Sequence, residues 1–151
     1  MLHVALLEPE IAGNVGNIAR SCVAVGAELH VIRPYGFRLS DAAVRRAGMD
    51  YWHDTRLVEH TSFAAFQEHF AEVFAARRVF AFTTKATVFH TQPAYARGDV
   101  LLFGPESRGL PEAVRAGCLE LRIPMRPEAR SLNLAVSVGI GLYEAWRQVG
   151  F

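Results

Sequence analysis

The sequence is poor in cysteine and in long apolar runs, and each shortage argues against a class of protein. Its two cysteines, Cys22 and Cys118, lie far apart and outside any Cys-x-x-Cys pair, which disfavours a disulfide framework or a cysteine metal site. No apolar run reaches the roughly 20 residues that a membrane-spanning helix needs. The first ten residues, MLHVALLEPE, lack the basic start of a signal peptide. We therefore expect a cytoplasmic protein with no membrane partner.

Lysine is also scarce: Lys85 is the only lysine, and the other fifteen basic residues are arginines. The chain has 151 residues and a net charge of +1. Arginine offers a planar fork that suits phosphates and carboxylates, although a GC-rich genome or a thermophilic host would give the same bias. The near-neutral total shows no charge excess typical of nucleic-acid binding. Length and composition fit one domain over residues 1–151.

Short apolar runs alternate with amphipathic segments, a pattern typical of an α/β protein with a mostly parallel sheet and flanking helices. The predicted strands are 2–7, 28–32, 79–84, 99–104 and 119–124. The predicted helices are 14–25, 41–47, 63–74, 111–117 and 132–148. Ser62 is expected to cap the third of these helices, whose phenylalanines recur at spacings of three and four and are predicted to lie in the core.

The last predicted helix holds two interior glycines, Gly139 and Gly141. Each costs about 0.5–1 kcal/mol relative to alanine. We expect another backbone to approach closely at both positions. We prefer helix packing between two subunits as the reason, with tight packing within the chain as the alternative.

Three stretches rich in polar residues and glycine each follow a predicted strand: 8–22, 104–111 and 123–137. Each has an ordinary explanation when taken alone, such as a capped helix with surface arginines, or an N-cap at Ser131 or Asn133. Ligands of open parallel sheets bind beyond the carboxyl ends of the strands, however, and TTK at 83–85 also follows a strand. The four segments together predict a binding site.

The chemistry of that site is limited by what these stretches lack. The loop GPESRGLP has no Lys-Ser/Thr pair after its second glycine, and no Gly-x-Gly-x-x-Gly is present, so neither a phosphate loop nor a dinucleotide turn fits. None of the six histidines lies in the three stretches, which disfavours a histidine base, and they contain no metal-ligand cluster. Free N–H groups around Gly13, Asn14, Gly16 and Asn17 at a helix start predict an anion site, with Arg20 one turn further on.

The segments NVGNIARSC, LLFGPESRGLP and IPMRPEARSLNLAVSVGIGLYEAWR resemble, in this order, the signature motifs of the SPOUT class of RNA methyltransferases. LEPEIAGNVGNIAR, RRAGMDYW, FTTK and YEAWRQ further resemble its minimal members, which methylate the ribose 2′-hydroxyl of a cytidine or modified uridine at the tRNA wobble position. The resemblance covers essentially the whole chain. It implies a C-terminal deep trefoil knot, a homodimer, S-adenosylmethionine as cofactor and the tRNA anticodon loop as partner.

The resemblance also implies roles for individual residues. Backbone groups of the knotted loops would hold the cofactor, with further side chains as walls; the positions are Phe82, Gly104, Glu106, Leu110, Ile123, Met125, Ser131, Leu132 and Asn133. The implied catalytic residue is Arg20. Because a guanidinium is a poor base, we expect it to bind the adjacent phosphate or stabilise the developing alkoxide. The RNA-side candidates are Asn14, Asn17, Arg126, Arg130 and Tyr143.

Alternatives remain open. The first alternative is a different RNA substrate, which is another tRNA position or ribosomal RNA. The second is a nucleotide-binding module without catalytic activity, and the third is methylation of a base in place of the ribose. Tyr35, Phe37, Tyr51 and Trp52 are candidates to stack on RNA bases, with core packing as the alternative for most of them.

Overall fold

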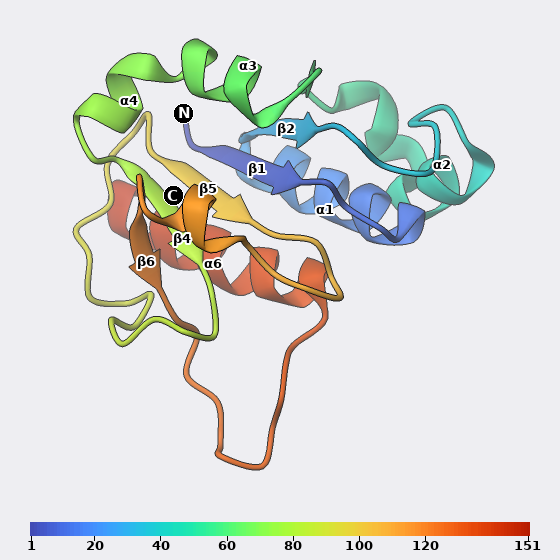
Figure 1. The fold of residues 1–151 in the computed structure, drawn as a ribbon. Coiled ribbons are helices and arrows are strands. Elements are labelled where there is room, and N and C mark those ends of the chain that lie inside the picture. The colour runs from blue at the N-terminus through green and yellow to red at the C-terminus, as the bar shows by residue number, and fades with distance from the viewer.

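The computed structural model describes all of residues 1–151 and contains one six-stranded, entirely parallel sheet with helices on both faces (Figure 1). The strands are β1 (His3–Leu7), β2 (Glu28–Ile32), β3 (Leu57–His60), β4 (Val79–Phe82), β5 (Val100–Phe103) and β6 (Leu119–Leu121), in the order β3-β2-β1-β5-β4-β6. The predicted α/β class is therefore confirmed.

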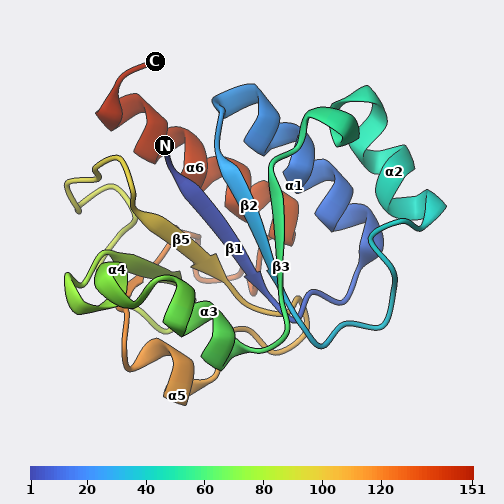
Figure 2. The ribbon, with the colours of Figure 1, turned by 90° about the horizontal axis from the view of Figure 1, so that it is seen from above.

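The helices form two layers, as Figure 2 shows. One face carries α1 (Ala12–Val25), α2 (Ala42–Gly48) and α6 (Leu134–Val149), and the other carries α3 (Phe63–His69), α4 (Ala71–Ala75) and α5 (Glu112–Arg115). Alternate strand residues point to opposite faces, so Leu6 packs in the α1/α6 core and Leu7 in the α3/α4 core. No helix is long and apolar enough to cross a membrane.

Several predicted elements differ from the observed ones in their bounds. Helix α1 begins at Ala12, two residues before the predicted start, and the strand β3 and the 3-10 helix η1 (Met49–Asp54) were not predicted. The predicted helix 63–74 is two helices, because Phe70 leaves the helical conformation with φ −107° and ψ 27°. Ser62 is confirmed as the cap of α3, since its side chain accepts a hydrogen bond from Ala65 N at 3.1 Å.

The predicted core position of the phenylalanine stripe is confirmed. Phe66 and Phe70 are buried on the α3/α4 face, and Phe63 and Phe74 pack against them. Trp52, one of the stacking candidates, packs partly against the core on the opposite face.

The two glycines of α6 have different surroundings, and neither meets another backbone of this chain. A β-carbon at Gly141 would lie 2.8 Å from the Phe82 ring, so a side chain at the end of β4 occupies that space. A β-carbon at Gly139 would meet nothing within 4 Å. Tight packing within the chain, the second of the two expectations, is therefore confirmed at Gly141, although the close neighbour is a side chain and not a backbone; for Gly139 an approach from a second subunit stays a prediction.

Candidate functional site

The loops that follow β1, β4, β5 and β6 enclose a cavity of about 520 Å³ at the carboxyl edge of the sheet. This first cavity is lined by every residue expected at the cofactor: Phe82, Gly104, Glu106, Leu110, Ile123, Met125, Ser131, Leu132 and Asn133. The four segments that were grouped because each follows a predicted strand are far apart in sequence, and all of them line this one cavity. The fold positions them through the common direction of the parallel strands.

The loop after β5 requires glycine at both of its ends. A β-carbon at Gly104 would lie 2.4 Å from the carbonyl carbon of Gly109 and from the nitrogen of Leu110, so the loop folds back onto its own start. Gly109 has φ +66°, in the left-handed region that favours glycine, and its N–H donates to Pro105 O at 2.9 Å. The loop is therefore a tight turn that presents its backbone to the cavity.

Two glutamates join this loop to the start of α1. The Glu106 carboxylate accepts hydrogen bonds from Glu10 N at 2.8 Å, Ile11 N at 2.7 Å and Asn14 Nδ2 at 3.2 Å. In return, the Glu10 carboxylate accepts from Ser107 N at 2.8 Å and Ser107 Oγ at 2.7 Å. The Ser107 hydrogen bonds hold the pKa of the Glu10 carboxyl below its ordinary value, which favours the charged form. We call this reciprocal pair the Glu10–Glu106 clamp.

The clamp changes the interpretation of the predicted anion site. The carboxylate nearest the N-terminus of α1 is the chain's own Glu106, which accepts from the backbone N–H groups of Glu10 and Ile11, just before the helix. Gly16 is also not part of an open site, because a β-carbon there would lie 2.2 Å from Val44 O and 2.6 Å from Ala47 Cβ of α2. Gly16 therefore serves helix packing, whereas an anion site at the N–H groups near Gly13 stays a prediction.

Asn14 lies on the cofactor side of the site, although it was expected to contact RNA. The residue is 6% exposed, and its amide bridges Glu106 and Asn133, accepting from Asn133 Nδ2 at 3.3 Å. Asn133 is in turn the N-cap of α6, because its Oδ1 accepts from Val136 N at 3.2 Å. Asn14 therefore joins α1 to the loop after β5 and to the start of α6.

A second cavity of about 480 Å³ adjoins the first, and Asn133 lines both. Three of the predicted RNA-side or catalytic residues, Asn17, Arg20 and Tyr143, line this second cavity. The Arg20 guanidinium forms no ion pair, and its Cζ lies 5.9 Å from the centroid of the Tyr51 ring. The arrangement leaves an unneutralised cation facing an open space beside the first cavity.

The two loop arginines lie in different places. Arg130 lines the first cavity, so the structure places it with the cofactor candidates and not in the second cavity. Arg126 lines neither cavity; its side chain is 88% exposed and lies 3.4 Å from Glu128. Their assignment to RNA stays a prediction.

Sequence reasoning missed parts of both cavities. Glu10 was not singled out, and Tyr51 was only one of several aromatic candidates, yet it lies 44% exposed beside Arg20. The clamp has no local signal, because Ser107 and Glu10 are 97 residues apart. The Thr-Thr-Lys segment after β4 was noticed as a strand-end loop, and the structure places it in the first cavity.

The model of the SpoU rRNA Methylase family matches residues 1–143. The chain belongs to this family. Along its full length the chain is 46% identical, over 154 aligned residues, to the tRNA (cytidine(34)-2′-O)-methyltransferase of Escherichia coli strain K12, of which it covers 96%. The resemblance to SPOUT methyltransferases noted in the sequence is thereby confirmed.

Solved structures of SpoU-family proteins match this chain closely. One of these structures comes from work on the 2-OH methylation of C/U34 on tRNA. It has a TM-score of 0.93 and is 51% identical, and the match covers 98% of this chain and 95% of that one. The SpoU methyltransferase AviRb from Streptomyces viridochromogenes, in complex with the cofactor AdoMet, has a TM-score of 0.88 and 28% identity over 98% of this chain and 60% of that one.

Proposed function

We propose that this SpoU-family protein transfers a methyl group from S-adenosylmethionine to the ribose 2′-hydroxyl of the wobble pyrimidine, a cytidine or modified uridine, in tRNA. The observation that carries the proposal is the pair of adjoining cavities. One is lined by the cofactor candidates and the other by Arg20, and Asn133 lies between them. The names of the similar proteins support the same reaction and the same position in tRNA.

The first cavity fits the cofactor. Its volume of about 520 Å³ falls within the roughly 300–1,000 Å³ of small-molecule sites. The tight turn between Gly104 and Gly109 brings backbone groups to the cavity wall, where they suit the edge of an adenine ring. S-adenosylmethionine, when bound, supplies an electrophilic methyl group on a sulfonium.

Arg20 acts on the acceptor side. A guanidinium is a poor base, so Arg20 does not remove the 2′-hydroxyl proton. It stabilises the negative charge that develops on the ribose oxygen, or holds the neighbouring phosphate so that the oxygen lies in line with the methyl group. Asn17, one turn earlier on α1, lines the same cavity and helps to orient the ribose.

The RNA substrate needs more surface than one chain offers, and a homodimer supplies it. The outer face of α6 is apolar and exposed at Val136 (50%), Ile140 (36%) and Tyr143 (45%), at helical spacing. Val136 and Tyr143 also line the Arg20 cavity, so a second chain on this face completes that cavity. Arginines from both chains then contact the phosphates of an anticodon loop, and Tyr51 stacks on an exposed base.

The remaining features of the proposal concern the whole chain. Residues 1–151 act as one cytoplasmic domain whose C-terminal part is a deep trefoil knot. Two contacts of the loop 83–98 support the knot. Phe89 bridges to Arg122 after β6, and Tyr95 N donates to Gln148 Oε1 of α6 at 2.9 Å, so the loop contacts both the segment before residues 123–133 and the helix after them.

The function is tested by incubating the protein with methyl-deuterated S-adenosylmethionine and total tRNA, followed by nucleoside mass spectrometry. We expect a label on the ribose of a wobble cytidine or uridine. Arg20→Ala should lower the rate by about 100-fold or more while the cofactor affinity, measured by calorimetry, stays unchanged. Arg97→Ala removes an exposed arginine at the opposite edge of the sheet and serves as the matched control.

Each other outcome would overturn a defined part of the proposal. A labelled base would refute ribose methylation, and a label found only in ribosomal RNA would refute the substrate. Cofactor binding without transfer to any RNA would indicate a binding module. Full activity of Arg20→Ala would refute the proposed role of Arg20 in catalysis.

A further inference from the structure

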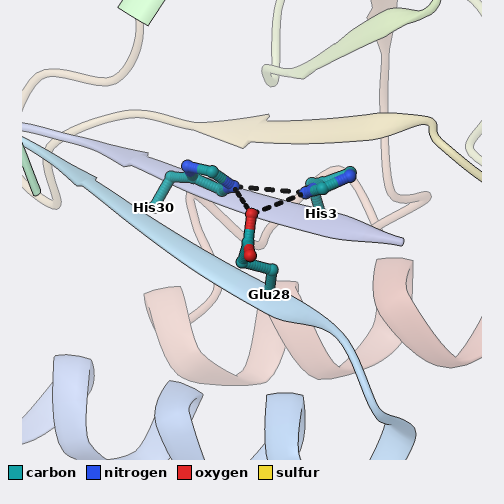
Figure 3. A group of neighbouring side chains, drawn as sticks. All are labelled: His3, Glu28 and His30. Carbon is teal, nitrogen blue, oxygen red and sulfur yellow. Dashed lines mark hydrogen bonds and ion pairs between the residues drawn. The ribbon is translucent and has the colours of Figure 1, made fainter. Parts of the chain in front are cut away.

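Far from the two cavities, the amino ends of β1 and β2 bring together two histidines and a glutamate. Figure 3 shows His3 on β1 and Glu28 and His30 on β2, with one atom of each directed at a common point. These atoms are His3 Nδ1, His30 Nε2 and Glu28 Oε1, and all lie within 4.8 Å of one another. The proposed methyl transfer uses none of the three residues.

The parallel register of the two strands creates this cluster. His3 pairs with Glu28 and Ala5 pairs with His30. His30 lies two residues after Glu28, so both side chains project to the same face as that of His3. This is the face covered by α3, where Phe70 packs edge-on against both imidazoles, with ring centroids at 5.1 Å from His3 and 4.8 Å from His30.

The distances among the three atoms match the edges of a tetrahedral metal site. The two nitrogens are 3.2 Å apart, and Glu28 Oε1 is 2.9 Å from His30 Nε2 and 3.3 Å from His3 Nδ1. Ligands bound tetrahedrally at about 2.0–2.1 Å from Zn²⁺ lie on the order of 3.3 Å from one another. Without a cation, the same three atoms are joined by hydrogen bonds, whose direction depends on which ring nitrogens carry protons.

A fourth residue provides the outer support that metal-binding histidines usually have. His60 of β3 is 6% exposed, and its Nε2 lies 2.9 Å from His30 Nδ1. When Nε2 of His30 binds a metal, Nδ1 carries the ring proton, and this N–H donates a hydrogen bond to His60 Nε2. The hydrogen bond fixes the tautomer and the orientation of the His30 ring. Three neighbouring strands thus contribute to one chain of contacts.

We propose that His3 Nδ1, His30 Nε2 and Glu28 Oε1 form a binding site for a first-row divalent transition metal ion. Two imidazoles and a carboxylate are a ligand set of both Zn²⁺ and non-haem Fe²⁺ sites, and the tetrahedral spacing of the three atoms favours Zn²⁺. His30 is fully buried, whereas the side chains of His3 and Glu28 are 18% and 25% exposed, so the ion and a fourth, water ligand enter from their side. The ion ties β1 to β2 at the edge opposite the cofactor loops.

The test uses the full chain after treatment with a chelator, titrated with ZnCl₂ in a calorimeter and with CoCl₂ in a visible spectrophotometer. We expect one ion per chain, the absorption bands of tetrahedral Co²⁺, and a melting temperature that rises with the Zn²⁺ concentration. His3→Gln and Glu28→Gln each remove one ligand at a partly exposed position and should weaken binding by more than about tenfold. His53→Gln, at an exposed histidine of η1, is the matched control and should bind like the unaltered chain.

The metal-free melting temperatures of the variants show whether they fold, and the cobalt spectrum reports on the ligand set without depending on stability. Absence of stoichiometric binding would overturn the proposal. Equal binding by His3→Gln, Glu28→Gln and the unaltered chain would also overturn it, as would a loss of binding in His53→Gln. Methyl transfer is not a readout here, so failure of this proposal leaves the proposed function untouched.

Discussion

Gly104 shows how one residue determines the shape of the cofactor cavity. A β-carbon at this position would lie 2.4 Å from backbone atoms of Gly109 and Leu110, and backbone cannot move aside as the end of a side chain can. Glu106 and Ser107, the two clamp residues of the loop, lie between these points of contact. Any displacement of the loop at Gly104 therefore also loosens its attachment to α1.

We expect Gly104→Ala to lower the free energy of unfolding by about 1–3 kcal/mol and to weaken S-adenosylmethionine binding. Urea unfolding and calorimetry measure the two effects. Gly13→Ala is the matched control, because its β-carbon would meet nothing within 4 Å at the start of α1. Unchanged stability and cofactor affinity in Gly104→Ala would contradict the close approach of the loop to its own start.

At the scale of elements, α6 is positioned by its contact with the end of β4. The side of the helix at Gly141 lies against the Phe82 ring, which stacks on Phe103 of β5 with centroids 4.5 Å apart. Both phenylalanines also line the first cavity. A larger residue at 141 therefore acts on the helix packing and on the cavity wall together.

Gly141→Ala and Gly139→Ala make a matched pair, because both remove the same backbone entropy cost from one helix. Gly141→Ala must displace the Phe82 ring, so its free energy of unfolding should fall below that of Gly139→Ala by about 1–3 kcal/mol. Unfolding at several protein concentrations separates any effect of subunit association. Equal stabilities would contradict the packing of Gly141 against Phe82.

Prediction of helices and strands from the sequence succeeded where the local residue pattern is strong. It failed where contacts with other parts of the chain determine whether the element forms. The runs of β1, β4 and β5 are apolar at every position or at all but one, and they were found; β2 was found although Glu28 and His30 interrupt its apolar residues. Strand β3 has only two apolar residues, Leu57 and Val58, and it exists because it pairs with β2. The break at Phe70 has no local signal either, since the phenylalanine spacing continues through it.

At the scale of the whole molecule, the exposed face of α6 is where a second chain is expected. We expect the protein to be dimeric in solution and Ile140→Glu to make it monomeric, because a charge would be buried in an apolar contact. Light scattering after size exclusion measures the mass. Val88→Glu, at another exposed apolar residue (41%) outside α6, should leave the dimer intact. A monomeric unaltered protein, or a dimeric Ile140→Glu, would refute this interface.

The sequence predicted which loops form the candidate site but not which of their residues form hydrogen bonds with one another. Parallel strands end at one edge of a sheet, so strand-end loops such as those at Gly104 and Ser131 were expected to meet. The sequence did not reveal which groups bind each other within the site. Asn14 became an RNA-side candidate through the family resemblance, whereas its amide contacts Glu106 and Asn133, which lie 92 and 119 residues away in the sequence.

The central place of β1 has a consequence for how the chain is made. β1 leaves the ribosome before both of its partners, β2 on one side and β5 on the other. Until residues 100–103 emerge, one edge of an apolar strand stays open to wrong partners. The arrival of β5 closes that edge and delivers Glu106 and Ser107 to Glu10. A growing chain therefore shields its most vulnerable strand and attaches its cofactor loop in the same step.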